Sequence, residues 1–282
     1  MIIIQKASSL TAYLEKQRGA GLTIGFVPTM GALHDAHIHL VEQSASVCDL
    51  TVCSIFVNPT QFNDPADYDK YPVTIESDIM KLARSRASVL FIPSVNDIYP
   101  AGTAQLERYD LGYLETILEG AFRPGHFQGV CQVMSRLLKL VQPGWVFMGQ
   151  KDYQQCMVIK RLLLLMGMQT MLVTCPTVRA QDGLAMSSRN VRLTNEQRAM
   201  APAIYQALQE IKMNLTPGNL KHLKDHAVLA LTSAGFNVEY LEIADAGTLQ
   251  TYDEWDGHTP LVAVTAAFAG DVRLIDNLLL NN

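Results

Sequence analysis

Two histidines that lie three residues apart, His34 and His37, form the part of this sequence best suited to chemistry. They follow an apolar stretch, 22–27, that is typical of a buried strand, and they precede a segment with the apolar spacing of a helix. The first turn of a helix has unpaired N–H groups and the positive end of the helix dipole, so it attracts phosphate. Imidazole N–H groups there can donate further hydrogen bonds, which favours a nucleotide-phosphate site.

Two other interpretations of these histidines stay open. With His39 included, the spacing H-x-x-H-x-H is one that a metal site can use. On a helix, however, His39 would face away from His37, because side chains two residues apart do not share a face. Ordinary histidines on a helix surface are the remaining interpretation.

Two further segments carry groups that bind phosphate. Gly149-Gln150-Lys151-Asp152 follows an apolar stretch, and it combines a glycine that lets the backbone approach a ligand with a point charge on Lys151. Met186-Ser187-Ser188-Arg189 combines two hydroxyls with a guanidinium, which can bind several phosphate oxygens at once. Taken singly, each segment is equally compatible with a polar turn or a linker whose charged side chain is solvated.

A third segment, Asn58-Pro59-Thr60-Gln61-Phe62, follows another apolar stretch and carries two carboxamides. Carboxamides in a partly buried loop need hydrogen-bond partners, so these either bind a substrate or bond to the loop's own backbone. Downstream, Asp64, Asp67 and Asp69 are candidates for a cation site or for a solvated acidic loop.

The elements that must position these residues alternate between strands and helices. We expect strands over 23–27, 50–57, 89–92, 145–148 and 171–174, several of them apolar throughout, as strands covered on both faces are. The clearest helical spacing covers 130–141, and another helix begins near 74–78. This alternation predicts an α/β fold with a parallel sheet, whose ligands gather at the carboxyl ends of the strands.

The pattern changes after about residue 180. A helix is predicted to start with Thr194 as its cap, and long helices continue to about Ala234 with a break at 216–218. Strands are predicted over 238–243 and 261–266. We therefore expect an α/β domain over 1–180 and a smaller C-terminal α+β domain over 185–282.

The composition excludes several classes of protein. Charged residues make up 17% of the 282 residues, below the roughly 25% of an average domain, which indicates a large core. The net charge of −5 gives no basic footprint, so we expect no nucleic-acid partner. Five scattered cysteines without a C-x-x-C pair indicate buried free thiols in a reducing compartment. We expect neither a signal peptide nor a membrane span, and we expect a cytoplasmic location.

Seven segments of the sequence, taken in order, resemble the pantoate–β-alanine ligase (pantothenate synthetase) family over essentially the full chain. They are PTMGALHDAHIHL at 28–40, NPTQF at 58–62, YP at 71–72, RPGHFQGV at 123–130, GQKDYQQ at 149–155, DGLAMSSRN at 182–190 and RLIDN at 273–277. The resemblance implies the Rossmann-like fold of the nucleotidyltransferase-like superfamily, with its His-x-Gly-His element. It also implies a cytoplasmic homodimer that forms pantothenate from pantoate and β-alanine with ATP and Mg²⁺.

The resemblance further implies a pantoyl-adenylate intermediate, release of AMP and pyrophosphate, and a set of site residues. Those expected at ATP are Met30, Gly31, Ala32, Leu33, His34, Asp35, Ala36, His37, Gly149, Gln150, Lys151, Asp152, Val178, Met186, Ser187, Ser188 and Arg189. His34, His37, Lys151 and Arg189 are expected to be catalytic, with His37 as the proton donor. Gln61 and Gln155 are expected to hold pantoate, and Gln61 also to lie near β-alanine. A nucleotidyltransferase of the same superfamily, which would release no AMP, is the alternative.

The sequence departs from the family pattern at three positions. Ala36 replaces the glycine between the histidines, Gln150 replaces a glutamate, and Val73 stands where an arginine commonly follows Tyr-Pro. If position 36 is helical, alanine is favoured there, whereas ATP affinity falls if the triphosphate needs the space.

Because an acyl adenylate hydrolyses in water, we expect the smaller domain to close over the site as a lid.

Overall fold

The computed structural model describes residues 1–62, 68–69 and 71–281, and these form two units. The first unit contains residues 1–149 and 154–176, and the second contains residues 150–153 and those from 177 onward. The sequence prediction placed the boundary between 180 and 185. Of the three carboxylates considered as a cation site, Asp64 and Asp67 lie outside the described residues.

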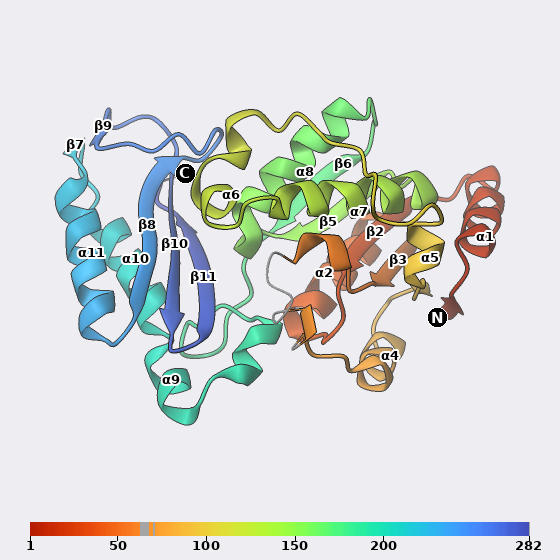
Figure 1. Cartoon of the computed structure of the whole chain (residues 1–282), viewed down its shortest axis with the longest axis horizontal. Coiled ribbons are helices and arrows are strands. Elements are labelled where there is room, and N and C mark those ends of the chain that lie inside the picture. The colour runs from red at the N-terminus through yellow and green to blue at the C-terminus, as the bar shows by residue number, and fades with distance from the viewer. Residues whose placement is uncertain (63–67, 70, 282) are drawn as a thin grey trace. The chain divides into compact units, whose positions relative to one another are not determined.

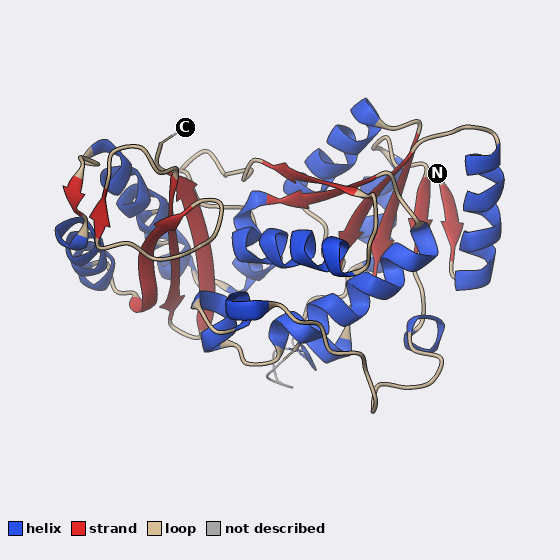
Figure 2. Ribbon diagram, turned by 90° about the horizontal axis from the view of Figure 1, so that it is seen from above, coloured by secondary structure: helices blue, strands red, loops and turns tan. Residues whose placement is uncertain are grey.

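The first unit is built on a six-stranded parallel sheet (Figures 1 and 2). In spatial order its strands are β1 (Ile2–Ile4), β4 (Val89–Phe91), β3 (Leu50–Ile55), β2 (Ile24–Thr29), β5 (Trp145–Gly149) and β6 (Met171–Cys175). The five predicted strands are confirmed with bounds that differ by one or two residues. Strand β3 is buried along its whole length, as the interior of a sheet covered on both faces requires.

Helices cover both faces of this sheet (Figure 2). Those that connect its strands are α1 (Ala7–Gly19), α2 (Asp35–Val47), α4 (Ile75–Ala83), α7 (His126–Val141) and α8 (Tyr153–Leu165). Shorter helices in the connections are η1 (Pro59–Gln61), α5 (Val95–Ile98), η2 (Gly112–Glu115) and α6 (Leu118–Phe122). With right-handed crossovers, this strand order puts α2 and α4 on one face and the other three long helices on the opposite face, and α1 does contact α7.

The strand order reverses between β2 and β5. From β2 the chain moves outward through β3 and β4, then returns across the sheet to β5 and continues outward through β6. Such a reversal leaves room for a ligand at the carboxyl ends of the two strands where it occurs. These ends carry Met30 and Gly149, the residues at which two of the predicted ATP segments begin.

The second unit has a three-stranded antiparallel sheet in the order β11 (Val272–Leu279), β10 (Leu261–Ala269) and β8 (Asn237–Asp245). Helices α10 (Ala203–Met213) and α11 (Lys221–Ser233) pack on it around a core of apolar side chains. The unit also contains η3 (Gln150–Asp152), η4 (Ser188–Arg192), α9 (Asn195–Met200) and a short pair of strands, β7 (Gly218–Asn219) and β9 (Glu254–Trp255).

The predictions for this half are largely confirmed. Thr194 caps α9, because its Oγ1 accepts the backbone N–H of Gln197 at 3.2 Å, and the break at 216–218 separates α10 from α11. Strand β11 was not predicted from the sequence. Nor were β1 and α1 of the first unit, because β1 has only three residues and α1 buries only Leu10 and Leu14.

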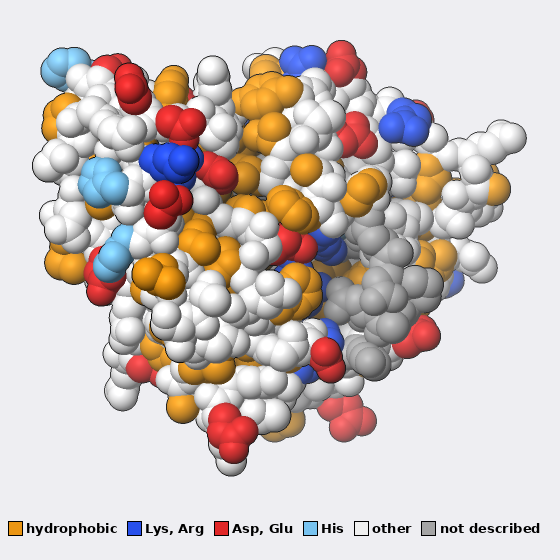
Figure 3. Space-filling view, turned by 60° about the vertical axis from the view of Figure 1, so that its left-hand side comes forward, with side chains coloured by type: hydrophobic (Ala, Val, Ile, Leu, Met, Phe, Trp, Pro, Cys, Tyr) orange, Lys and Arg blue, Asp and Glu red, His pale blue; other side chains and the backbone are white. Residues whose placement is uncertain are grey.

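The charged side chains and the cysteines can now be located in the structure. On the face shown in Figure 3, the described lysines and arginines are interspersed with acidic side chains and form no broad basic patch. All five cysteines are buried free thiols. No helix among the described residues is both long enough and apolar enough to cross a membrane.

Candidate active site

The turn between β2 and α2 places the two histidines at a helix start, as predicted. Gly31 has a φ of +86°, which an L side chain rarely adopts, and helix α2 begins at Asp35. The backbone N–H of His34 lies 3.2 Å from Nδ1 of His37, and the two imidazole rings are 4.0 Å apart. Both rings therefore stand beside the first-turn N–H groups of α2, where an anion is stabilised by the helix dipole.

Asp78, which the sequence analysis did not single out, holds this turn from helix α4. Its side chain is fully buried, and its two carboxylate oxygens accept the backbone N–H groups of Ala32 at 2.9 Å and Leu33 at 2.8 Å. Thr74 Oγ1 donates to the same carboxylate at 3.1 Å, and Lys81 Nζ donates to the Leu33 carbonyl. Charge-assisted bonds to backbone N–H groups are among the stronger hydrogen bonds, so α4 fixes the path of the chain into α2.

Asn58 fixes the side chain of Gln61. Its Oδ1 accepts the Tyr99 hydroxyl at 2.8 Å, and its Nδ2 donates to the Gly129 carbonyl at 3.1 Å and to Gln61 Oε1 at 3.2 Å. Because a backbone carbonyl can only accept, the amide of Asn58 has one orientation. Gln61 Oε1 is thereby engaged, and its Nε2 lies 2.8 Å from Met30 Sδ, beside the turn that leads to the histidines.

The backbone around Gln61 is held by helix α7. His126 Nδ1 donates to the Gln61 carbonyl at 2.8 Å, while Arg123 Nη1 lies 3.2 Å from the other ring nitrogen. Gly129 on the same helix allows η1 to approach closely, since an added Cβ there would lie 2.2 Å from the Thr60 carbonyl oxygen. The RPGHFQGV segment thus supports the loop that carries Gln61.

The neighbouring glutamines at the start of α8 differ in their surroundings. Gln154 is buried, accepts the backbone N–H of Glu119 at 3.0 Å and donates to the carbonyls of Leu114 and Ile117. Its amide is fully used in holding α6 and η2. Gln155 is half-buried on the next position of the helix, and its assignment to pantoate stays a prediction.

In the second unit, η3 contains Gln150, Lys151 and Asp152. Lys151 has a mostly buried side chain, 17% exposed, with its Nζ 3.8 Å from Asp152 Oδ1. Asn277 on β11 donates from Nδ2 to the carbonyls of Gln150 and Lys151, each at 2.9 Å. The helical turn that carries the predicted phosphate-binding lysine is therefore anchored to the three-stranded sheet.

The hairpin that leads to Met186–Arg189 is anchored to the same strand. Met186 N donates to the Val178 carbonyl at 3.0 Å, which pairs these two predicted ATP residues across the hairpin. Arg179 makes two hydrogen bonds with Asp276, at 2.6 and 3.0 Å, and lies 3.8 Å above the Tyr205 ring. Burial raises the pKa of the Asp276 carboxyl, and the positive charges of Arg179 and Lys151 oppose this rise.

The metal interpretation of the histidines is not supported. Within the part of the chain that the structure describes, no three His, Cys, Asp or Glu side chains form a group that could hold a metal ion. His39 lies on α2 beyond its first turn, away from the start of the helix where His34 and His37 lie.

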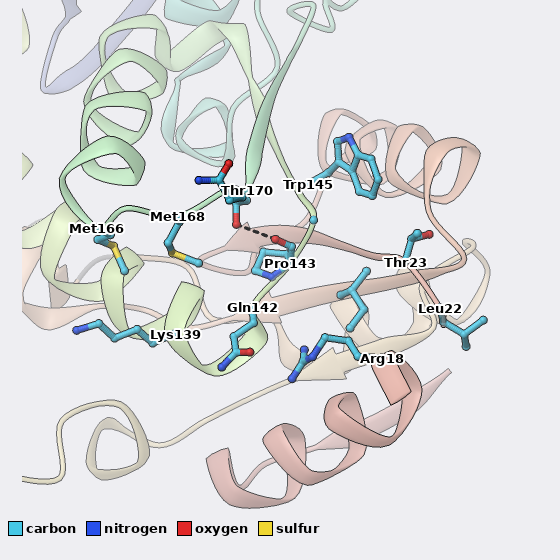
Figure 4. A pocket seen from close by; sticks show the side chains of 13 residues that line it. Arg18, Leu22, Thr23, Lys139, Gln142, Pro143, Trp145, Met166, Met168 and Thr170 are labelled. Atoms are coloured by element: carbon cyan, nitrogen blue, oxygen red, sulfur yellow. Dashed lines mark hydrogen bonds between the residues drawn. The ribbon is translucent and has the colours of Figure 1, made fainter. Parts of the chain in front are cut away.

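A cavity of about 650 Å³ lies at the opposite, amino end of β2 and β5 (Figure 4). Its lining includes Arg18, Lys139, Met166 and Met168, and none of the predicted site residues. The helices α7 and α8 end there, so they direct carbonyl oxygens rather than N–H groups towards it. These helix ends disfavour phosphate at the amino end of the sheet, whereas at the carboxyl end of β2 the start of α2 presents N–H groups.

A family model described as pantoate-beta-alanine ligase matches residues 2–279. The chain belongs to this ligase family. It is 42% identical over 280 residues to the pantothenate synthetase of Porphyromonas gingivalis, with 99% of each chain covered. It is also 42% identical over 284 residues to the enzyme of Hydrogenovibrio crunogenus, with 100% of each chain covered.

Solved structures of the family have the same fold as this chain. The pantothenate synthetase of Thermus thermophilus is 38% identical to this chain. The match covers 100% of both chains and has a TM-score of 0.91. The ligase of Francisella tularensis, in complex with beta-gamma ATP and β-alanine, is 37% identical over 100% of this chain and 98% of its own, with a TM-score of 0.82. Membership of the family makes this chain an enzyme, a pantoate–β-alanine ligase.

Sequence reasoning missed the residues that hold the site in place. Asp78, Asn277 and Asp276 bond to backbone or charged groups far away in the sequence, so no local spacing marks them. Two signals were available: Asp276 and Asn277 stand in the RLIDN segment, and His126 and Gly129 stand in RPGHFQGV.

Proposed function

We propose that this chain makes pantothenate in two steps that share one adenylate intermediate. In the first step, a carboxylate oxygen of pantoate attacks the α-phosphorus of ATP, the bond to the bridging oxygen breaks, and pyrophosphate leaves. In the second step, the amine of β-alanine attacks the acyl carbon, AMP leaves with the electron pair of the C–O bond, and the amine gives up a proton.

The first step needs alignment and charge stabilisation rather than a base. A carboxylate is already ionised at pH 7, and the developing charge lies on the pyrophosphate. We assign the stabilisation of this charge to the start of α2 with His34 and His37, together with Lys151 and Arg189. A well-aimed donor of this kind is worth on the order of 10²–10³ in rate.

Neutral amides suit the nucleophile better than a cation does. A guanidinium paired with the attacking carboxylate would bind it firmly and also reduce its nucleophilicity. The family resemblance assigns Gln61 and Gln155 to pantoate, with Gln61 also near β-alanine, and neutral amides fit that role. The fixed amide of Gln61 supports the assignment, because Asn58 occupies its Oε1 and leaves the donor nitrogen on the side of Met30.

We further propose that Mg²⁺ enters with ATP as part of the substrate. Mg²⁺ in such sites is usually held by phosphate oxygens, waters and one or two carboxylates rather than by a dedicated protein cage. The predicted ATP set contains two carboxylates, Asp35 and Asp152. We assign the contact with a water on such an ion to Asp152, which lies next to Lys151.

A homodimeric, cytoplasmic enzyme is the remaining part of the proposal. It comes from the family resemblance, and the five buried free thiols are compatible with a reducing compartment. Sedimentation of the purified protein tests the oligomeric state.

The match of the family model over residues 2–279 carries the proposed reaction. The experiment is an assay of the purified chain with each substrate left out in turn. We expect AMP and pyrophosphate in equal amounts only when ATP, pantoate and β-alanine are all present. A retained adenylylated product without AMP would indicate a nucleotidyltransferase, and ADP as product would exclude the proposed mechanism.

A further inference from the structure

Asn277 has every polar atom of its side chain occupied by η3. Its Nδ2 donates both of its hydrogens, one to the Gln150 carbonyl and one to the Lys151 carbonyl, each at 2.9 Å. Its Oδ1 accepts Nε2 of Gln150 at 3.2 Å. The residue is 2% exposed, so these bonds are made away from competing water.

The backbone of Asn277 is itself held firmly. Its N–H donates to Asp276 Oδ1 at 2.8 Å, and its carbonyl accepts Arg179 Nη2 at 3.2 Å. The guanidinium of Arg179 is in turn fixed by its two bonds to Asp276, by the Gly183 carbonyl at 3.1 Å and by stacking on Tyr205. Asn277 is therefore a rigid support and not a flexible surface amide.

The two adjacent residues of β11 serve two segments predicted to bind ATP. Asn277 holds η3, which carries Lys151, whereas Asp276 holds Arg179 at the base of the hairpin that leads to Ser187 and Arg189. Successive side chains of a strand point to opposite faces, so one strand can hold both segments at a fixed spacing. Phosphoryl chemistry depends on such spacing, because a small misplacement of a charged group costs much of its effect.

We propose that Asn277 is a positioning residue for Lys151 in the ligase reaction. The inference rests on the proposed function, which assigns Lys151 to the phosphates of ATP. The polar atoms of the Asn277 side chain are already used by η3, so it acts through the lysine and not on the substrate. It fixes the main chain on either side of Lys151, so that binding of ATP costs no further loss of main-chain freedom there. The side chain of Gln150 takes part as a donor to Asn277, a bond that a glutamate at this position could not donate.

The test is a double-mutant cycle with Asn277→Ala and Lys151→Met in the full-length protein, read by pyrophosphate release and by the KM for ATP. We expect Asn277→Ala alone to lower kcat/KM for ATP by roughly 10- to 100-fold. In the Lys151→Met background the same change should cost less than about twofold, because the group that Asn277 positions is gone. Asn277→Ser, which keeps one donor and preserves more of the fold, should give an intermediate loss.

A matched control is Asn281→Ala in the same unit. Asn281 also bonds to the backbone in two places, to the Thr259 carbonyl at 3.0 Å and to the Leu261 N–H at 2.7 Å, and neither belongs to η3. We expect it to lower thermal stability without changing the KM for ATP.

Two results would overturn the inference, and they differ in what they say of the proposed function. Equal losses from Asn277→Ala with and without Lys151 would show a general structural role and leave the function of Lys151 intact. A Lys151→Met variant with wild-type turnover of ATP would refute the role of the lysine itself, and with it the reason for positioning it.

Discussion

Asp78 and Leu33 lie 45 residues apart in the sequence, yet the carboxylate of Asp78 accepts the Leu33 backbone N–H at 2.8 Å. Through this bond helix α4 sets the direction in which the chain enters α2, one residue before His34. The predicted phosphate site therefore depends on a residue that touches no predicted substrate group.

We expect Asp78→Asn to lower both stability and ATP binding. The amide nitrogen that replaces one oxygen would face a backbone N–H, either of Ala32 or of Leu33, and leave a buried donor unpaired. Such a loss is worth about 1–3 kcal/mol. Urea unfolding measures the stability, and steady-state kinetics should show a higher KM for ATP.

Glu76→Gln is the control for this change, because Glu76 is an exposed acidic residue on the same helix. It should leave both quantities unchanged. A normal KM for ATP in Asp78→Asn would show that the turn keeps its geometry without the carboxylate.

We expect Gly129→Ala to displace the loop that carries Gln61. The added Cβ would lie 2.2 Å from the Thr60 carbonyl oxygen and 2.6 Å from the Gln61 Cα, so η1 must move away from α7. Overpacking of this kind costs about 1–3 kcal/mol, and the KM for pantoate should rise more than the KM for ATP. Gly19→Ala, where an added Cβ meets nothing within 4 Å, is the control, and equal effects on both substrates would argue against a local displacement.

Ala36→Gly tests the departure from the family glycine. Residue 36 lies in the first turn of α2, where alanine is the better helix former. We expect the glycine variant to lose up to about 1 kcal/mol of stability and to keep its KM for ATP within about twofold. A marked gain in ATP affinity would mean that the alanine methyl obstructs the triphosphate.

Gln155→Glu tests the proposed pantoate contact. A carboxylate in place of the neutral amide would repel the pantoate carboxylate, and like charges in contact cost several kcal/mol. The KM for pantoate should rise by on the order of 10²-fold, whereas Gln155→Met, which adds no charge, should do less harm. Near-normal binding of pantoate to the glutamate variant would refute the contact.

The buried thiols should resist modification in the native protein. Burial raises the pKa of Cys53 and of Cys131 to about 12, and that of Cys48 to about 11. Because the thiolate is the reactive form, raising the pH from 7 to 9 should produce little reaction with a thiol reagent until the chain is unfolded. Titration before and after addition of guanidinium chloride measures this, and rapid reaction of the native protein would show that a thiol is accessible.

The sequence alone determined the local features of the protein. Apolar runs gave the interior strands, Thr194 marked a helix start, and the residues 30–37 lay where a strand meets a helix, as predicted. These features depend on neighbours within a few residues, and local backbone preferences decide them. The exceptions were short or weakly patterned: β1 has three residues, and α1 buries only two.

Only the tertiary structure decided what holds the site residues in place. The strand order, with its reversal between β2 and β5, follows from how the helices pack on both faces of the sheet, and no local pattern records it. The bonds from Asp78 to Leu33 and from Asn277 to Lys151 join segments 45 and 126 residues apart. A buried carboxylate or amide looks like any surface residue in the sequence, because its role comes from the backbone groups that folding brings to it.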